Sequence, residues 1–486
     1  MKSLNDKSLF REAGLIGGKW VAAGSGKTVD VLDPATQSAI GTVPDMAGAE
    51  TRAAIEAAAS AYRDWRKKTN AERAALLEAW HGLMLAHLDD LALILTTEQG
   101  KPLDEAKGEI RYGASFVKWF AEEARRINGH TIPSPTPDRR IIVLKEPVGV
   151  CGIITPWNFP NAMITRKVAP ALAAGCTVVI KPSEFTPYSA LALGVLAERA
   201  GIPAGVINIV TGMPAEIGNE IMANVTVRKI SFTGSTRVGS LLMRGAADSV
   251  KRLSLELGGN APFIVFDDAD LDLAIEGALV SKFRNGGQTC VCANRIVVQA
   301  GVYDAFAAKL TARVNAMTVG PGTQPGVVIG PMINMAAVEK INRHVADALA
   351  KGAAIVTEKQ AALPEGSQYV APLVLTGATK DMQLAGEETF GPVAPLFRFE
   401  TEEEAIALAN GTPYGLASYF YTENLKRAWR VGEALEFGMV GLNTGSVSME
   451  VAPFGGVKQS GLGREGAQAG SEEYLEMKSF HMGGLG

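Results

Sequence analysis

Residues 282–295 have the composition of a loop that carries a catalytic nucleophile. Cys290 lies there in a glycine-rich bend, with Gly286 and Gly287 just before it and Arg284 six positions upstream. A cysteine nucleophile needs room for a substrate and backbone N–H donors for the oxyanion that it creates, and paired glycines provide both. The segment therefore predicts covalent catalysis through Cys290.

The overall composition excludes several other classes of protein. The chain has 486 residues, of which 47% are hydrophobic and 20% are charged, and its net charge is −4. This is a soluble, globular composition with enough residues for two or three domains. No basic face is available for nucleic acid, and no apolar run approaches the ~18 residues of a membrane span. We expect neither a nucleic-acid partner nor a membrane partner.

Cysteine and histidine usage predicts a reducing compartment and a mechanism without metal. Four cysteines in a chain of this length do not form a disulfide framework, and none of the five histidines is grouped with cysteines at zinc-ligand spacing. The first residues are polar and mixed in charge, unlike a secretory signal or a typical transit peptide. We therefore expect a cytoplasmic protein.

Strands and helices alternate from residue 148 to residue 260, which predicts a parallel sheet with helices on both faces. The expected strands are 148–155, 177–180, 206–210 and 229–232, and the expected helices are 161–175, 188–200, 215–223 and one starting at 236. A second rhythm follows, with strands at 263–266, 297–299, 353–356 and 395–399. A nucleotide would bind where the strands of the first sheet end.

Two further segments stand outside this rhythm. Residues 50–130 are alanine-rich and amphipathic, which predicts helices. Residues 139–145 form a strand that follows a three-proline stretch and belongs to no strand–helix unit. We expect this strand to be an arm or an edge strand that pairs outside its own sheet.

Seven short motifs resemble those of the aldehyde dehydrogenase superfamily, in order and in spacing. They are PWNFP at 156–160, KPSE at 181–184, FTGS at 232–235, LELGGN at 255–260, GQTC at 287–290, ETFGP at 388–392 and PFGG at 453–456. The resemblance covers nearly the whole chain and is greatest for the succinate-semialdehyde branch. It implies an α/β fold with a Rossmann-type cofactor domain, an α/β catalytic domain and a β oligomerisation arm.

The resemblance also implies the catalytic roles. Cys290, as a thiolate, would attack the aldehyde to form a thiohemiacetal, and the Asn158 side-chain amide with the Cys290 N–H would hold the oxyanion. Glu256, which lies 34 residues before the nucleophile, would activate the water that hydrolyses the resulting thioester. The apolar neighbours of Glu256 should raise its pKa toward the range of a general base.

The cofactor residues follow from the same motifs. A small turn at Gly234 and Ser235, after a strand and before a helix, lets a pyrophosphate approach the positive end of that helix. The usual glycine-rich dinucleotide fingerprint is missing, and the family uses a looser turn. The resemblance assigns cofactor contacts to Thr155, Trp157, Lys181, Ser183, Glu184, Gly234, Ser235, Glu388 and Phe390.

Glu184 bears on the choice of cofactor. A carboxylate accepts hydrogen bonds from both ribose hydroxyls and repels a 2′-phosphate, so we expect NAD rather than NADP. Lys181, which resembles the other ligand of the adenosine ribose, could tolerate the phosphate, so NADP use stays open. Glu388 and Phe390 resemble the contact to the nicotinamide ribose.

Two arginines and a serine resemble the substrate site of the succinate-semialdehyde branch. Arg166, Arg284 and Ser448 would bind the distal carboxylate, because the planar guanidinium fork suits bidentate carboxylate binding. The alternative is that the arginines are solvated surface residues. Glutarate semialdehyde is the second candidate substrate, since one methylene is typically worth only ~1–3 kcal/mol of discrimination.

Cys292 has two interpretations. It is either a small apolar filler or a redox partner that forms a strained, easily reduced disulfide with Cys290. Two other functions are alternatives for the whole chain. A CoA-acylating dehydrogenase commonly lacks the general base, and a non-catalytic relative would lack the nucleophile or the base, so Glu256 and Cys290 argue against both.

The chain is expected to divide into three parts. Residues 1–125 and 147–258 would form the NAD(P)-binding domain, and residues 259–458 the catalytic domain. Residues 126–146 and 459–486 would form the oligomerisation arm of a homodimer or homotetramer. The sequence does not identify the pathway, whether 4-aminobutyrate breakdown or another source of semialdehyde.

Overall fold

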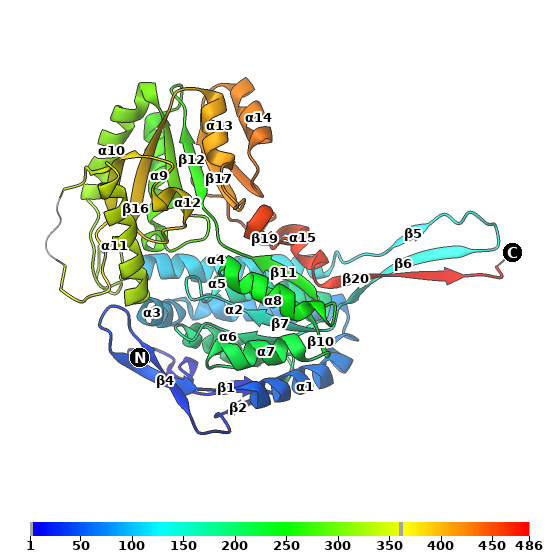
Figure 1. Cartoon of the computed structure of the whole chain (residues 1–486). Helices are drawn as coiled ribbons and strands as arrows, with labels where there is room; N and C mark the ends of the chain where they lie inside the picture. Colours follow the sequence, from blue (N-terminus) through cyan, green and yellow to red (C-terminus); the bar gives the residue numbers. More distant parts are fainter. Residues whose placement is uncertain (1–2, 359–362, 486) are drawn as a thin grey trace.

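The computed structural model describes residues 3–358 and 363–485 as two α/β lobes with a projecting arm (Figure 1). Each lobe is built on a mostly parallel sheet, as the alternation of strands and helices predicts. Residues 1, 2, 359–362 and 486, which belong to the predicted domains and arm, lie outside the described residues. The domain limits themselves stay predictions.

The first sheet has eight strands. Five parallel strands form its centre, and short antiparallel strands flank them on both edges. In spatial order the strands are β19 (Gly461–Leu462), β11 (Arg252–Glu256), β10 (Val227–Thr233), β7 (Val150–Ile154), β8 (Thr177–Lys181), β9 (Ile207–Ile209), β1 (Gly14–Ile16) and β2 (Lys19–Val21). β19 corrects the sequence prediction, because it comes from the segment assigned to the arm yet pairs with β11 of this sheet.

The order of these strands creates a switch point beside β7. The chain runs from β7 to β8 and β9 in one direction, and then returns to place β10 and β11 on the other side of β7. Loops that leave β7 and β10 at their carboxyl ends therefore diverge and leave a crevice between them. The nucleotide site that the sequence predicts at the strand ends would lie at this edge of the sheet.

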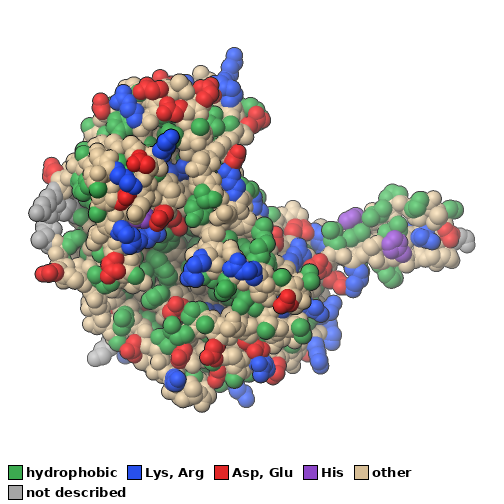
Figure 2. Space-filling model, viewed as in Figure 1, with side chains coloured by type: hydrophobic (Ala, Val, Ile, Leu, Met, Phe, Trp, Pro, Cys, Tyr) green, Lys and Arg blue, Asp and Glu red, His purple; other side chains and the backbone are tan. Residues whose placement is uncertain are grey.

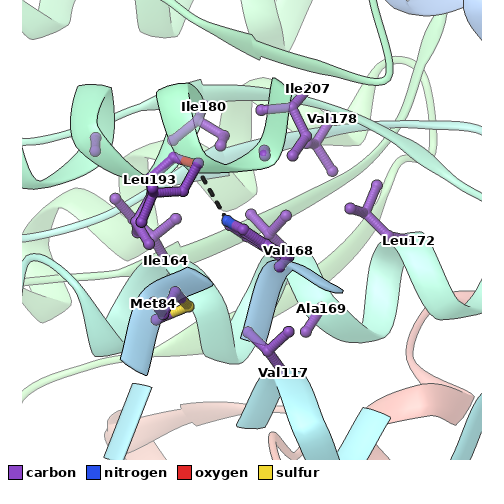
Figure 3. Packing of buried hydrophobic residues seen from close by; sticks show 14 of the residues in the cluster. Met84, Val117, Ile164, Val168, Ala169, Leu172, Val178, Ile180, Leu193 and Ile207 are labelled. Atoms are coloured by element: carbon purple, nitrogen blue, oxygen red, sulfur yellow. Dashed lines mark hydrogen bonds between the residues drawn. The ribbon is translucent and has the colours of Figure 1, made fainter. Parts of the chain in front are cut away.

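Helices cover the first sheet, and α5 is the most deeply buried of them. They are α1 (Gly48–Trp65), α2 (Asn70–Ala86), α3 (Leu88–Gln99), α4 (Leu103–Ala124), α5 (Ala162–Ala174), α6 (Pro187–Arg199), α7 (Pro214–Ala223) and α8 (Thr236–Ala247). Every residue of α5 is buried, since α2 and α4 lie against it on the side away from the sheet. Figure 3 shows Val168 and Leu172 of this helix among side chains of the sheet and the neighbouring helices.

The second sheet has seven strands, of which only the edge strand β14 is antiparallel. Their spatial order is β14 (Ala354–Ile355), β15 (Leu373–Ala378), β16 (Val393–Phe399), β13 (Ala293–Gln299), β12 (Ala261–Val265), β17 (Ala417–Tyr421) and β18 (Met439–Leu442). The helices of this part are α9 (Leu271–Phe283), α10 (Tyr303–Asn315), α11 (Met335–Ala350), α12 (Gln383–Gly386), α13 (Glu402–Asn410) and α14 (Leu425–Ala434). The strands predicted in this half are confirmed, and β15, β17 and β18 were not predicted.

The arm is a separate three-stranded sheet that extends from the body (Figures 1 and 2). It consists of β5 (His130–Ile132), β6 (Arg140–Pro147) and β20 (Leu475–Met482), while β3 (Thr28–Leu32) and β4 (Ala39–Pro44) form a hairpin elsewhere. β6 is the strand predicted at 139–145, and β20 pairs with it antiparallel from Leu475 to Met482. No helix in the described parts of the chain is long and apolar enough to cross a membrane.

Leu172 offers a test of the α5 packing. Leu172→Ala should lower the free energy of unfolding by about 2–5 kcal/mol, because a fully buried leucine in a filled interior leaves a cavity when truncated. Leu241→Ala is the matched control, since Leu241 lies on helix α8 and is 53% exposed. Denaturant melts of both variants should separate them clearly, and equal losses would show that α5 is not tightly packed.

Candidate active site

Cys290 lies between the lobes, in the turn that joins the short helix η2 (Arg284–Gly287) to β13. Gly286 and Gly287 have φ values of 63° and 77°, in the left-handed region that favours glycine. A Cβ on Gly287 would also lie 2.3 Å from the carbonyl oxygen of Gly391. The paired glycines are thus required by backbone conformation and by close packing.

The backbone N–H of Cys290 makes no hydrogen bond with any described residue, so it is available to an oxyanion. Asn158, in the loop between β7 and α5, donates one amide hydrogen to the Gln288 carbonyl at 3.0 Å and keeps the other free. The main-chain carbonyl of Asn158 accepts from the Lys101 ammonium at 2.9 Å and the Asn285 amide at 3.1 Å. These contacts fix the donor that the sequence predicted beside the nucleophile.

Glu256 is the last residue of β11 and reaches the nucleophile from the other lobe. Its side chain is buried, and Oε2 makes no hydrogen bond within the described residues. Burial, reinforced by the neighbouring carboxylate of Glu465, raises the pKa of Glu256 well above its usual range. Gly455 makes room for this carboxylate, since a Cβ there would lie 2.8 Å from Oε1. The direction of the shift is the one that the apolar neighbours of Glu256 predicted.

Burial raises the pKa of the Cys290 thiol to about 12. Arg166 and Arg284 lower it, while Glu388 and Glu256 raise it further. The sulfur must therefore lose a proton that it holds at neutral pH before it attacks as the predicted thiolate. The sequence showed the nearby arginines but not the depth of the pocket, and desolvation is the larger effect here.

One cavity of about 390 Å³ brings together most of the predicted cofactor residues with the nucleophile. Its walls include Trp157, Asn158, Gly234, Ser235, Cys290, Glu388 and Phe390, from both lobes. The cavity lies beside the switch point, at the carboxyl ends of β7 and β10. Ser235 caps helix α8 by accepting from the Val238 N–H at 3.4 Å, so the positive end of that helix faces this edge.

The remaining predicted cofactor residues lie at the ends of β7 and β8. Lys181 and Glu184 form an ion pair at 2.7 Å. Ser183 lies between them in sequence, and its hydroxyl accepts from the Phe185 N–H at 3.3 Å. The buried Thr155 hydroxyl has no hydrogen-bond partner among the described residues. An unpaired hydroxyl, a cation and a carboxylate at a helix-lined crevice fit the phosphates and riboses of a dinucleotide.

Glu388 and Phe390 form the wall opposite the first lobe. The Glu388 carboxylate accepts from the Gly259 N–H at 3.3 Å, and burial raises its pKa to about 7. Phe390 has a φ of 58°, a strained value for a non-glycine residue, and its ring meets Trp157 edge-on with centroids 5.7 Å apart. This ring contact therefore joins the two walls of the crevice.

The predicted substrate arginines have different environments. Arg284 is half-buried, lies 5.1 Å from the centroid of the Phe159 ring, and makes no hydrogen bond or ion pair with any described residue. It lines a small pocket that also contains Ser448, so the structure brings these two predicted ligands together. No carboxylate of the described residues lies within ion-pair distance of Arg284, and that of Glu105 interacts with it from farther away. A partly desolvated guanidinium with free N–H donors suits an anionic ligand.

Arg166 is buried and already has an anion. Its Nε forms an ion pair with Glu465, and its guanidinium lies 4.1 Å from the centroid of the Phe454 ring. The rest of the guanidinium has weak acceptors, because Nη2 contacts the sulfur of Met163 at 3.0 Å and the Tyr112 phenol is the other hydrogen-bonding group beside it. The surface alternative is thus wrong for Arg166, and one edge of its fork stays available to a ligand.

Glu465 is the main residue that sequence reasoning missed. Its carboxylate pairs with both Arg166 and Lys167, and it lies in the segment predicted to form the arm. The one available signal was the pair of adjacent cations in an otherwise apolar helix, which requires a buried anion somewhere. Nothing in the sequence identifies which carboxylate, 298 residues away, supplies it.

Cys292 is more than an apolar filler. It is buried, and its sulfur contacts the Lys282 ammonium at 3.3 Å and the Lys282 carbonyl at 3.5 Å. All four cysteines are free. A disulfide with Cys290 would have to break the contacts to Lys282, and the redox role of Cys292 stays a prediction.

The high pKa of Cys290 predicts how the alkylation rate of its thiol depends on pH. Only the thiolate reacts with iodoacetamide, so the rate of alkylation at Cys290 should rise about tenfold per pH unit between pH 7 and pH 10. Peptide mapping by mass spectrometry measures the rate at this site, and Cys290→Ser identifies the background. A rate that levels off near pH 8 would show that the thiol is already activated.

Comparison with known proteins identifies the family. The sequence profile described as "Aldehyde dehydrogenase family" matches residues 20–480. The chain is 59% identical to a glutarate-semialdehyde dehydrogenase of Pseudomonas putida, over 98% of both chains. It is 58% identical to a succinate-semialdehyde dehydrogenase [NADP(+)] of Escherichia coli, over 99% of both chains.

A solved structure agrees with these matches in fold. The succinate-semialdehyde dehydrogenase of Burkholderia pseudomallei is 61% identical and superimposes with a TM-score of 0.97, covering 99% of this chain and 100% of that one. The α/β fold expected from the motifs is therefore confirmed, together with the enzyme class. The chain belongs to the aldehyde dehydrogenase family.

Proposed function

We propose that this protein oxidises succinate semialdehyde to succinate with NAD or NADP. The observation that carries the proposal is Arg284, a half-buried arginine that makes no ion pair or hydrogen bond with any described residue, six positions before the nucleophile. A substrate carboxylate would complete its charge pairing. The names of the relatives from Escherichia coli and Burkholderia pseudomallei support this substrate.

The chain's own residues account for the steps at the aldehyde carbon. The sulfur of Cys290 forms a bond to this carbon after losing its proton, and the new oxyanion takes the Cys290 N–H and an Asn158 amide hydrogen as donors. Bound NAD(P) supplies the acceptor for the two electrons that take the carbon to the thioester level. Glu256 then takes a proton from the water that hydrolyses this thioester, a role suited to its raised pKa.

Glutarate semialdehyde is the second candidate substrate. It carries the same distal carboxylate, and the relative from Pseudomonas putida is named for it. The two substrates differ by one methylene, which a pocket discriminates by only about 1–3 kcal/mol. Arg284 therefore supports the class of substrate, an aldehyde with a carboxylate at the far end, more strongly than its length.

The rival functions differ from this proposal at single residues. A CoA-acylating enzyme would release its thioester to a thiol and has no need of a buried base, whereas Glu256 is present and buried with an unpaired oxygen. A non-catalytic protein has no need of Cys290 at the cavity. Both residues favour a hydrolytic dehydrogenase.

Assembly and location belong to the same proposal. The arm exposes Ile132, Leu144, Met477 and Phe480, apolar side chains that a second subunit could cover. We expect a homodimer or a homotetramer. The four free cysteines support a reducing compartment, the cytoplasm, and 4-aminobutyrate breakdown is one pathway that would supply the substrate.

Arg284→Ala tests the substrate. Its kcat/KM for succinate semialdehyde should fall about a hundredfold, because the variant loses a charge-assisted contact to the carboxylate, and kcat/KM for butanal should stay unchanged. Native protein should prefer succinate or glutarate semialdehyde to butanal by two orders or more. Arg244→Ala, at an exposed arginine on helix α8, is the matched control. Equal rates for butanal and the charged aldehydes in native protein would refute the proposal.

Glu184→Ser tests the cofactor. Removing this carboxylate from its pair with Lys181 leaves a free ammonium where a 2′-phosphate would lie, so the ratio of kcat/KM with NADP to kcat/KM with NAD should rise about tenfold or more. Steady-state rates with both cofactors measure the ratio. An unchanged ratio would mean that Glu184 does not set the preference.

A further inference from the structure

Tyr112 lies on helix α4 and faces the nucleophile across a small apolar cluster. Its ring meets Phe116 edge-on, with centroids 5.0 Å apart, and packs with Phe159 and Met163 in the cluster that Cys290 also contacts. Helix α4 runs along α5, the helix that carries Arg166. The phenol therefore lies in the same region as the nucleophile and the substrate arginine.

The hydroxyl group of Tyr112 has no acceptor for its proton. The oxygen is buried, and the side chain that it does hydrogen-bond, the Arg166 guanidinium, can donate to the phenol oxygen but cannot accept its proton. The charged groups that act on it most strongly are the guanidinium groups of Arg166 and Arg284, and guanidinium only donates. The nearest carboxylate, that of Glu465, is engaged by Arg166 and Lys167. Burial also raises the pKa of Tyr112, so the hydroxyl keeps its proton at neutral pH.

Three donors around the cluster are therefore incompletely used. They are the Tyr112 hydroxyl, the Arg166 guanidinium, whose Nη2 contacts the sulfur of Met163, and the guanidinium of Arg284, which makes no hydrogen bond with a described residue. A carboxylate offers about four lone-pair positions and can accept from several donors at once. A neutral aldehyde of similar length offers nothing to a donor at its far end.

We infer that Tyr112 is a further substrate-binding residue, whose O–H donates a hydrogen bond to the anionic end of the aldehyde beside Arg166 and Arg284. The inference rests on the proposed function, because it assumes an anionic substrate. It assigns Tyr112 a role in selecting charged over neutral aldehydes. The hydroxyl has no part in the steps at Cys290.

Tyr112→Phe removes the hydroxyl and keeps the ring packing against Phe116. The KM for succinate semialdehyde should rise about tenfold, while kcat stays within about twofold, because the lost contact is to the part of the substrate that does not react. The kcat/KM for butanal should stay unchanged. Steady-state kinetics with both aldehydes, at saturating cofactor, measures the split.

Tyr421→Phe is the matched control. Its hydroxyl is also buried and has no acceptor for its proton among the described residues, but it lies in the second lobe against Gly277. This variant should leave both aldehydes unaffected. If Tyr112→Phe does not fold, Tyr112→His replaces it, since the imidazole N–H can donate, and its KM for succinate semialdehyde should stay within about threefold of native.

The outcomes separate this inference from the proposed function. If native protein prefers charged aldehydes and Tyr112→Phe keeps that preference in full, the inference is wrong and the proposed function stands. If the variant loses activity equally on butanal and succinate semialdehyde, Tyr112 has a structural role and the inference is wrong. If native protein shows no preference for charged aldehydes, both are overturned. A tenfold rise in KM by Tyr112→His would also contradict the inference.

Discussion

The ion pairs of Glu465 with Arg166 and Lys167 are the interaction on which the active site depends most. All three side chains are buried, and two cations removed from water without an anion would be strongly destabilising. The carboxylate comes from the segment after β19, while both cations come from α5 of the first lobe. This cluster therefore joins the carboxyl-terminal segment to the helix behind the nucleophile loop.

The charges of the cluster extend their influence to the reacting groups. Arg166 lowers the pKa of Cys290, and Glu465 raises the pKa of Glu256. Burial acts in the opposite direction on the thiol and outweighs Arg166, so the pKa of the Cys290 thiol and that of the Glu256 carboxyl are both raised. A protonated thiol is stable in a desolvated pocket, where an isolated thiolate is not.

Much of this arrangement could be predicted from the sequence, because it depends on local patterns. The strand–helix alternation identified the parallel sheets, and the glycines before Cys290 do adopt the left-handed conformation. The motif residues 156–158, 233–235 and 388–390 do line one cavity. In each case residues close in sequence determine a turn or a strand end, and the fold places those ends at one edge.

What could not be predicted depends on contacts between distant segments. The partner of Arg166 is one such contact, and the assignment of β19 to the arm failed because a two-residue strand carries almost no sequence signal. The raised pKa of Cys290 could not be predicted for a related reason, since the depth of a pocket is a property of the assembled lobes. Tyr112 is half-buried on an amphipathic helix, where an aromatic residue is ordinarily part of the core.

The separation of Glu465 from its cations has a consequence for the order of events in the cell. Lys167 and Glu465 are 298 residues apart, and a ribosome that adds about 5–20 residues per second needs roughly 15–60 s to cover that interval. During this time Arg166 and Lys167 of α5 have no carboxylate from the carboxyl-terminal segment to pair with. The nascent first lobe must therefore keep this helix hydrated or loosely docked, and the catalytic centre closes only when translation has passed Glu465.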